Sequence, residues 1–261
     1  MMWTTRPRSD LHGLAALRAG DGPRVVLLHG VGLRAEAWAP IIDGLSGQFS
    51  VIAPDMPGHG QSPRRDGMQR VADYAAALAP LLGEPAHVVG HSMGAMIALH
   101  LAATQGAFVR SVTAFNAVFE RSAQAQHAVQ ARADSLDGET SPDPTPTLAR
   151  WFGDHRSPEQ AACATWLSEV DPRGYRQAYC AFAYDPGPSR AELAQITCPA
   201  HFVTGGLEPN STPVMSHAMA ALCPQGRAQI VADAAHMLPM THPTEALRGL
   251  ALHATTHPCP L

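Results

Sequence analysis

The sequence predicts an α/β fold in which helices flank a mostly parallel, twisted sheet and a helical lid is inserted after the sixth strand. Three observations predict this fold. Apolar runs that read as buried strands alternate with helical stretches over residues 24–116. A Gly-x-Ser-x-Gly motif at residues 90–94 lies between one of these strands and the helix after it. The alternation then stops, and residues 117–190 contain helical stretches but no buried strand.

The chain therefore divides into a core and a lid. With 261 residues, it is long enough to be one large α/β domain with an insertion. We expect residues 1–116 and 191–261 to form the core and residues 117–190 to form the lid. Because the lid follows the strand after the Gly-x-Ser-x-Gly motif, we expect it to cover the ends of the strands.

The first half of the chain is expected to supply most of the sheet. Residues 1–23 read as one or two edge strands, and the apolar run over residues 24–29 reads as a parallel strand buried on both faces. Expected after it are a helix over 35–45, a strand over 50–54, a helix over 70–82, a strand that ends near residue 91, a helix to about residue 104 and a strand over 110–115.

The second half is expected to supply the lid and the last two strands. Helical patterns cover residues 122–133, 146–152, 158–169 and 175–183 of the lid. The sheet resumes with a strand over 200–204, a helix over 213–222, a strand over 228–232, a loop over 233–240 and a closing helix over about 243–253.

Composition and charge argue against several classes of partner. The net charge is −4 at pH 7 without a basic cluster, which argues against nucleic acids and anionic membranes. No apolar run approaches membrane-spanning length, and the N-terminal stretch lacks the apolar segment of a signal peptide. We therefore expect a cytoplasmic protein that acts on a small molecule, and leave open whether it forms a homo-oligomer.

The cysteines and histidines indicate neither a disulfide framework nor a metal site. The five cysteines are scattered, and none forms a Cys-x-x-Cys pair. The fourteen histidines are dispersed, and most lack a carboxylate at ligand spacing. We therefore expect neither a metal ion nor another cofactor.

The Gly-x-Ser-x-Gly motif centres on Ser92 and predicts a nucleophile elbow. An apolar run precedes it and a helix-forming run follows it, as this motif requires. Residues two before and two after the serine crowd together at such a turn, so that both must be small, as Gly90 and Gly94 are. The following helix points its first N–H groups at the serine, where they can stabilise a developing negative charge.

A serine nucleophile needs a base within hydrogen-bond reach and a carboxylate that orients this base. In an open α/β sheet, such residues lie beyond the carboxyl ends of the strands. His236 follows the last expected strand in a loop and is the predicted base. His59 and His91 are alternatives by proximity, but His91 lies in the turn itself and His59 is expected to brace its own loop.

The predicted carboxylate is Glu208, which follows the seventh expected strand. The chain order Ser92, Glu208, His236 is the order that this architecture imposes. Asp233, three residues before His236, and Glu120, just after the sixth strand, are left open as alternatives. Such a carboxylate stays ionised, because its role is to hold the imidazole tautomer and to stabilise the imidazolium.

The main-chain N–H groups of Val31 and Met93 are predicted to form the oxyanion hole. Glycines around Val31 leave N–H groups free to point into a site. Because only the main chain acts there, substitutions of Val31 and Met93 should be tolerated better than substitutions of Gly30 and Gly32.

Together these residues resemble the α/β-hydrolase superfamily over nearly the whole chain, and in particular its small bacterial 3-oxoadipate enol-lactonase and esterase group. The matching segments are residues 27–30, 55–62, 90–94, 204–205 with Glu208, and 235–236. Residues 150–152 in the lid, and 204–215 with 236–239, are also similar to that group. The resemblance implies Ser92 as nucleophile, His236 as base and Glu208 as acid, with Val31 and Met93 as oxyanion donors. The family usually has an aspartate where this chain has Glu208, and a serine at the elbow excludes the dehalogenase pattern.

The resemblance implies an acyl-transfer hydrolase. Ser92 is expected to attack the carbonyl of a small carboxylic ester or (enol-)lactone, and water then cleaves the acyl-enzyme. One alternative is hydrolysis of a C–C bond in a vinylogous diketone, which the same three residues would serve. Another is a non-catalytic member of the fold that binds a small ligand, which would be expected to lose one of these residues.

The lid is expected to carry the residues that select the substrate. Some of its aromatic side chains, Trp151 among them, should line a largely apolar pocket. Arg150 or Arg173 would meet a substrate carboxylate, as the enol-lactone of a dicarboxylic acid requires. A solvated lid arginine is the competing interpretation for each.

Overall fold

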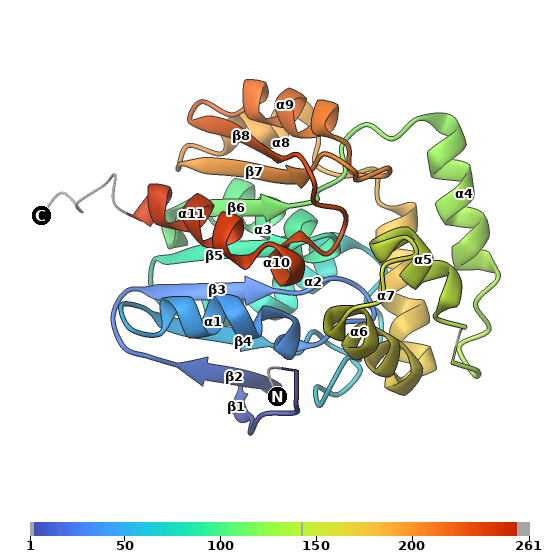
Figure 1. Ribbon diagram of the computed structural model, residues 1–261. Helices are drawn as coiled ribbons and strands as arrows, with labels where there is room; N and C mark the ends of the chain where they lie inside the picture. The colour runs from blue at the N-terminus through green and yellow to red at the C-terminus, as the bar shows by residue number, and fades with distance from the viewer. Residues whose placement is uncertain (1–2, 142, 255–261) are drawn as a thin grey trace, which may run out of the picture.

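A mostly parallel sheet forms the centre of the computed structural model, which describes residues 3–141 and 143–254. The strands are β1 (Ser9–Leu11), β2 (Leu14–Ala19), β3 (Arg24–Leu28), β4 (Ser50–Pro54), β5 (Ala86–His91), β6 (Val109–Phe115), β7 (Ala200–Gly205) and β8 (Gly226–Val231). Within the described residues they form one sheet in the order β1-β2-β4-β3-β5-β6-β7-β8 (Figure 1). Only the pairs β1–β2 and β2–β4 are antiparallel in this sheet, so the expected mostly parallel sheet is confirmed.

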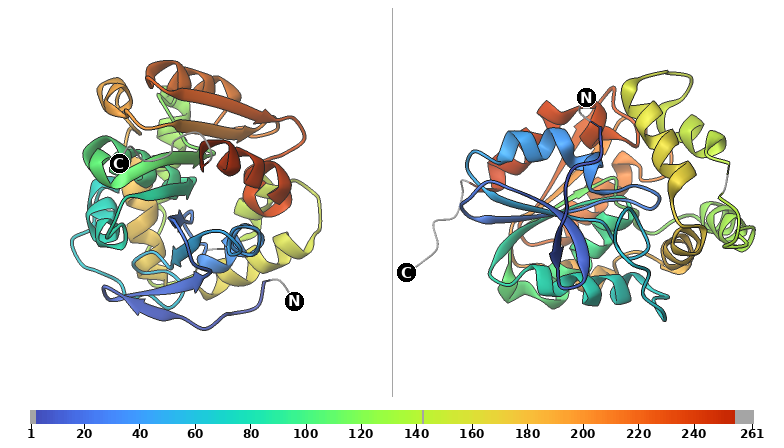
Figure 2. Two further views of the ribbon diagram at one scale, coloured as in Figure 1. Left: turned by 90° about the vertical axis from the view of Figure 1, so that its left-hand side faces the viewer. Right: turned by 90° about the horizontal axis from the view of Figure 1, so that it is seen from below.

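Helices cover both faces of the sheet (Figure 2). One face carries α2 (Val71–Leu78), α3 (Met93–Thr104), α8 (Arg190–Gln195) and α9 (Pro213–Leu222), and the other carries α1 (Ala39–Leu45), α10 (Leu238–Thr241) and α11 (Pro243–Ala254). Short 3₁₀ helices are η1 (Ala35–Trp38), η2 (Ala79–Leu81) and η3 (Gly106–Phe108). None of the described helices combines the length and the apolar character needed to span a membrane.

Strand β3 shows why the buried strands read as continuous apolar runs. Val26 and Leu28 pack into the core beneath α3, on one face of the sheet. Val25 and Leu27 pack into the core beneath α1, on the other face. Successive side chains of a strand point to opposite faces, so a strand covered on both sides needs apolar residues at every position.

Among the described residues, four helices between β6 and α8 form a layer beyond the carboxyl ends of the strands (Figure 1). They are α4 (Ala123–Asp134), α5 (Thr145–Phe152), α6 (Pro158–Glu169) and α7 (Pro172–Tyr184). Leu167, Tyr175 and Tyr179 belong to a small apolar core of their own. These helices form the lid expected after the sixth strand. Its limits at residues 117 and 190 stay a prediction, and residues 1–2 and 255–261 of the expected core lie outside the described residues.

The structure differs from the expectation at three short helices. The expected helix over 35–45 begins as η1, and α10 occupies part of the expected loop over 233–240. Single turns of this length are too short to show a helical period. Helix α8 was not expected either, although its start carries a capping box: the N–H of Ser189 donates to the Glu192 carboxylate, and the N–H of Glu192 donates to the Ser189 hydroxyl.

Candidate active site

Ser92 lies in the turn between β5 and α3, with φ of 56° and ψ of −119°. Side chains other than glycine rarely adopt a φ in this region, so the backbone is strained there. Hydrogen bonds hold the turn: the N–H of Ser92 donates to the Phe115 carbonyl at 2.9 Å, and its carbonyl accepts from the N–H of Ala95 at 2.9 Å. This backbone conformation places the serine side chain at the apex of the turn, as the elbow motif predicts.

Glycine is required on both sides of this turn. A Cβ atom on Gly90 would lie 2.0 Å from the Gly94 carbonyl oxygen. A Cβ atom on Gly94 would lie 2.1 Å from the Leu28 carbonyl oxygen. Neither distance is compatible with two non-bonded atoms, so any side chain here would push α3 away from β5 and β3.

His236 and Glu208 meet in the loops that follow β8 and β7. The Nδ1 atom of His236 lies 2.7 Å from Oε2 of Glu208, whose side chain is buried. The N–H groups of Asn210 and Ser211 donate to the other oxygen, Oε1, and the Asn116 amide donates to Oε2. Burial alone would raise the pKa of Glu208, but the positive charge and hydrogen bond of His236 and the N–H groups of Asn210 and Ser211 lower it to about 2. The carboxylate is therefore ionised at neutral pH.

The two alternative carboxylates have other partners. Asp233 is exposed and lies 3.5 Å from Nε2 of His242. Glu120 is also exposed and pairs with Arg190 at 2.7 Å. Of the three carboxylates named from the sequence, the structure places Glu208 in contact with His236.

His91 contacts the main chain of His236. Burial lowers the pKa of His91 to about 3, so its imidazole is neutral at physiological pH. Its Nε2 lies 2.8 Å from the His236 carbonyl oxygen, so Nε2 carries the proton and donates it. His91 thus fixes the loop that carries His236.

His59 and His29 join the loop after β3 to the loop after β4. The N–H of Gly32 donates to Nε2 of His59 at 3.0 Å, and the N–H of Met56 donates to Nε2 of His29 at 2.9 Å. Burial lowers the pKa of His59 to about 3, which keeps its Nε2 free to accept. His59 therefore braces the loop after β3 as well as its own loop.

The predicted oxyanion donors come from two segments, the loop after β3 and the start of α3. Val31 follows β3, and Met93 is the first residue of α3. Within the described residues, neither N–H donates to a main-chain carbonyl. Gly32, which follows Val31, has a φ of 77°, and a Cβ atom there would lie 2.5 Å from Cδ2 of Leu167 in the lid. This close approach explains why the loop needs glycine at residue 32.

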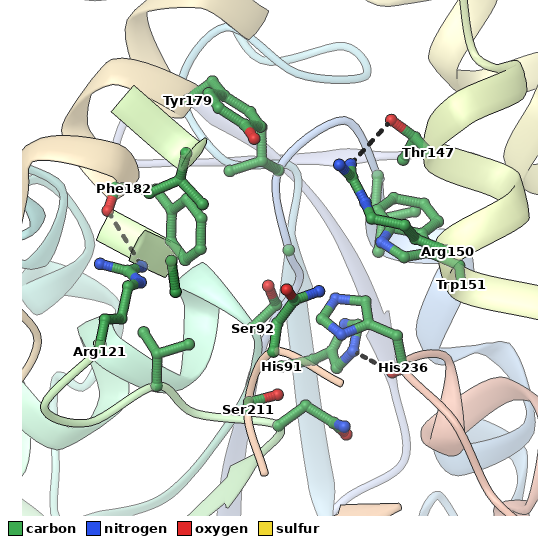
Figure 3. Close-up of a pocket in the computed structure, with 18 of the residues that line it drawn as sticks. His91, Ser92, Arg121, Thr147, Arg150, Trp151, Tyr179, Phe182, Ser211 and His236 are labelled. Atoms are coloured by element: carbon green, nitrogen blue, oxygen red, sulfur yellow. Dashed lines mark hydrogen bonds between the residues drawn. The ribbon is translucent and has the colours of Figure 1, made fainter. Parts of the chain in front are cut away.

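Ser92 and His236 line one cavity beneath the lid (Figure 3). Helices α4, α5 and α7 supply its outer wall, which includes Val129, Tyr179 and Phe182. Arg150 and Trp151 of α5, the lid residues predicted to bind the substrate, line this cavity. Arg173 is exposed and lines a separate surface groove, which agrees with the interpretation of Arg173 as a solvated lid arginine.

Arg121 also lines the cavity, although the sequence did not single it out. It follows β6 closely, and residues just beyond the end of a central strand are candidates for a site. The guanidinium donates to the carbonyls of Asp185 at 2.8 Å and Phe182 at 3.3 Å, and its Cζ lies 4.5 Å from the Phe182 ring centroid. Its position after a strand was the signal that sequence reasoning missed.

Two arginines line the cavity. Arg121 and Arg150 are part of its lining, whereas no aspartate or glutamate among the described residues is. Nη2 of Arg150 lies 3.4 Å from the Thr147 hydroxyl, one turn back on α5. In the part of the chain that the structure describes, neither arginine forms an ion pair with a carboxylate. Both cations of the lining thus lack an ion-paired carboxylate among the described residues.

The cysteine and histidine side chains of the described residues form no metal-binding cluster. Over residues 3–141 and 143–254, no three His, Cys, Asp or Glu side chains are placed to hold a metal ion. Cys163, Cys180, Cys198 and Cys223 are free thiols, and Cys259 lies outside the described residues.

The pKa of Glu208 predicts how stability depends on pH. It is about 2 in the folded protein against an ordinary 4.5, so the unfolded chain binds more protons below about pH 4.5. The ionised carboxylate stabilises the fold above that pH by about 3 kcal/mol, and this contribution is lost as the pH falls towards 2. Between pH 6 and pH 3, the free energy of unfolding measured by urea denaturation should fall by about 2 kcal/mol more for the wild type than for Glu208→Gln. Equal losses would contradict the low pKa.

This chain resembles known proteins over most of its length. The model of the Alpha/beta hydrolase family matches residues 25–250. The (E)-2-((N-methylformamido)methylene)succinate hydrolase of Acinetobacter baylyi is 35% identical over 245 residues, which cover 92% of this chain and 93% of that protein. The pimeloyl-[acyl-carrier protein] methyl ester esterase of Chromobacterium violaceum is 32% identical over 253 residues, which cover 91% and 96%.

A solved structure shows the same fold. The enol-lactonase from Burkholderia xenovorans LB400 superimposes with a TM-score of 0.82 at 23% identity, covering 95% of this chain and all of that one. Together with the two relatives, this likeness extends over more than nine-tenths of the chain, so that it includes the lid as well as the sheet.

Proposed function

We propose that this chain, which belongs to the alpha/beta hydrolase family, cleaves a small carboxylic ester or enol-lactone through an acyl-enzyme. Membership confirms the resemblance predicted from the motifs, and the chain is a hydrolase of the α/β fold. One observation supports this reaction most directly. His236 contacts the buried Glu208 at 2.7 Å and lines the same cavity as Ser92, whose backbone is strained.

In the proposed first half-reaction, the Oγ atom of Ser92 bonds to the substrate carbonyl carbon while Nε2 of His236 takes the hydroxyl proton. The carbonyl oxygen becomes an oxyanion that accepts hydrogen bonds from the N–H groups of Val31 and Met93. The tetrahedral intermediate then collapses. Its bond to the leaving oxygen breaks, and that oxygen takes the proton from His236.

In the second half-reaction, water replaces the leaving group. The water oxygen attacks the acyl carbon while His236 takes a proton from the water. The bond between the acyl carbon and Oγ of Ser92 then breaks, and Oγ takes the proton back from His236. Glu208 stays ionised throughout. It holds the Nδ1–H tautomer of His236 and stabilises the imidazolium that forms in each half-reaction.

We further propose that the substrate carries a carboxylate in addition to the bond that is cleaved. Figure 3 shows Arg121 and Arg150 on opposite sides of Ser92, and no acidic side chain lines the cavity among the described residues. The Arg150 guanidinium has no ion pair with a carboxylate among the described residues, which suits recognition of a substrate carboxylate by paired N–H donors. The relative from Acinetobacter baylyi is named for a succinate, which is a dicarboxylate.

The substrate proposal is tested with two esters of equal acyl length, methyl butyrate and monomethyl succinate. The second carries a carboxylate, and a charge-assisted hydrogen bond to Arg150 should raise its kcat/KM at least about tenfold over the first. Arg150→Gln should remove most of this preference while leaving hydrolysis of methyl butyrate nearly unchanged. Arg173→Gln, in the separate groove, is the matched control and should keep the preference. Equal kcat/KM for both esters in the wild type would rule out recognition of a carboxylate.

Hydrolysis of a C–C bond stays the alternative reaction for the same three residues. It is distinguished by its products, because an ester or lactone releases an oxygen leaving group whereas a C–C hydrolase releases a carbon one. Turnover of a vinylogous diketone, together with no turnover of either ester or of an enol-lactone, would favour this alternative.

A further inference from the structure

The side chain of Trp151, from lid helix α5, stacks on the ring of His236. The two ring centroids lie 5.5 Å apart, and the ring planes differ by 21°. This is an offset stack rather than an edge contact. Both residues line the same cavity as Ser92, and His236 lies beside Ser92 there (Figure 3). The stack therefore joins the lid to the residue proposed as the base.

The other contacts of His236 come from the core of the molecule. Its Nδ1 atom meets Glu208, and its carbonyl accepts from His91, whose ring centroid lies 4.9 Å away. Since His91 is neutral at physiological pH, it does not repel a positive charge on His236. Arg150 is the cation nearest in sequence to Trp151, and its Nη2 faces Thr147. The charged group that contacts His236 directly is thus the Glu208 carboxylate.

We propose that Trp151 is a positioning residue for His236, an inference that rests on the proposed function. The hydrogen bond at Nδ1 fixes one atom of the imidazole but still allows the ring to tilt about it. The stacked indole limits this tilt, so that Nε2 stays directed at Ser92. The electron-rich face of the indole also lies within about 6 Å of the imidazole, near enough to stabilise the imidazolium formed during catalysis.

The packing of α5 makes this contact depend on the lid. Trp151 and Phe152 pack against an apolar cluster that contains Met237 and Met240. Met237 directly follows His236 in the chain, so α5 contacts both the base and the segment that carries it. A displaced lid would lose the stack and leave His236 held by the core alone.

The first test is kinetic and uses the wild-type protein with Trp151→Leu and Trp151→Phe. On a small acetate ester, Trp151→Leu should lower kcat about tenfold with little change in KM, because the base is less well aligned and its cation less stabilised. Trp151→Phe restores an aromatic face and should recover most of the loss. Phe152→Leu is the matched control, since it removes a neighbouring ring from the same apolar cluster. Its kcat should stay within about twofold of the wild type.

The second test is spectroscopic. Contact with an imidazole alters the fluorescence of an indole, so the emission of Trp151 should differ between the wild type and His236→Gln at one pH. His236→Gln should leave the emission unchanged in a Trp151→Phe background and change it in a Phe152→Leu background. An equal effect of His236→Gln with and without Trp151, or a kcat of Trp151→Leu equal to that of the wild type, would overturn the inference. Full activity of His236→Gln would instead contradict the proposed function, which separates the two failures.

Discussion

Replacing Ser92 by alanine is expected to lower kcat for ester hydrolysis by about 10⁴- to 10⁶-fold. The serine oxygen is the atom proposed to bond to the substrate, and no neighbouring hydroxyl lies at the apex of the strained turn. The same substitution should abolish covalent labelling by a fluorophosphonate, which marks an activated serine. Rates are measured on monomethyl succinate, and the labelled peptide of the wild type is identified by mass spectrometry.

A serine elsewhere on the protein supplies the control for this experiment. Ser168 is exposed on α6, where its hydroxyl donates to the Ala164 carbonyl at 2.9 Å. Ser168→Ala should keep both activity and labelling. Labelling that persists in Ser92→Ala would identify another nucleophile. A wild type that binds small carboxylates but neither labels nor hydrolyses esters would favour the non-catalytic alternative.

Local signals explain which parts of the fold were predictable. The bounds of α6 and α9 agree with the expected helices over 158–169 and 213–222, because both begin with a proline at the first helical position. Ser157 and Thr212 precede these prolines and accept a hydrogen bond from the first turn of each helix. Signals of this kind lie within a few residues of one another, so that the sequence alone displays them.

Contacts between distant segments were not predictable in the same way. The chain order of Ser92, Glu208 and His236 follows from the architecture, but three carboxylates remained open until the loops were placed in space. The stack of Trp151 on His236 depends on how the lid packs against the loop after β8, which no short motif encodes. The position of Arg121 beyond β6 is a signal that several other residues share, so it does not by itself distinguish a site residue.

Replacing Glu208 by glutamine should lower kcat by about 10²- to 10⁴-fold, for a reason that its contacts define. The N–H groups of Asn210 and Ser211 both donate to Oε1 of Glu208. A glutamine that keeps these two bonds must put its oxygen there, so its NH₂ group faces Nδ1 of His236. Nδ1 then has to accept, and the imidazole proton moves to Nε2, the nitrogen that should take the proton of Ser92. The variant thus holds the base in the wrong tautomer.

Steady-state rates of Glu208→Gln are compared with those of Asp233→Asn and Glu120→Gln. The last two carboxylates pair with His242 and Arg190 at exposed sites, so their variants should keep rates within about twofold of the wild type. A near-wild-type rate for Glu208→Gln with a large loss in Asp233→Asn would move the orienting role to Asp233. Since glutamine matches the shape of Glu208, a large loss in the folded variant reports the charge and the tautomer rather than the packing.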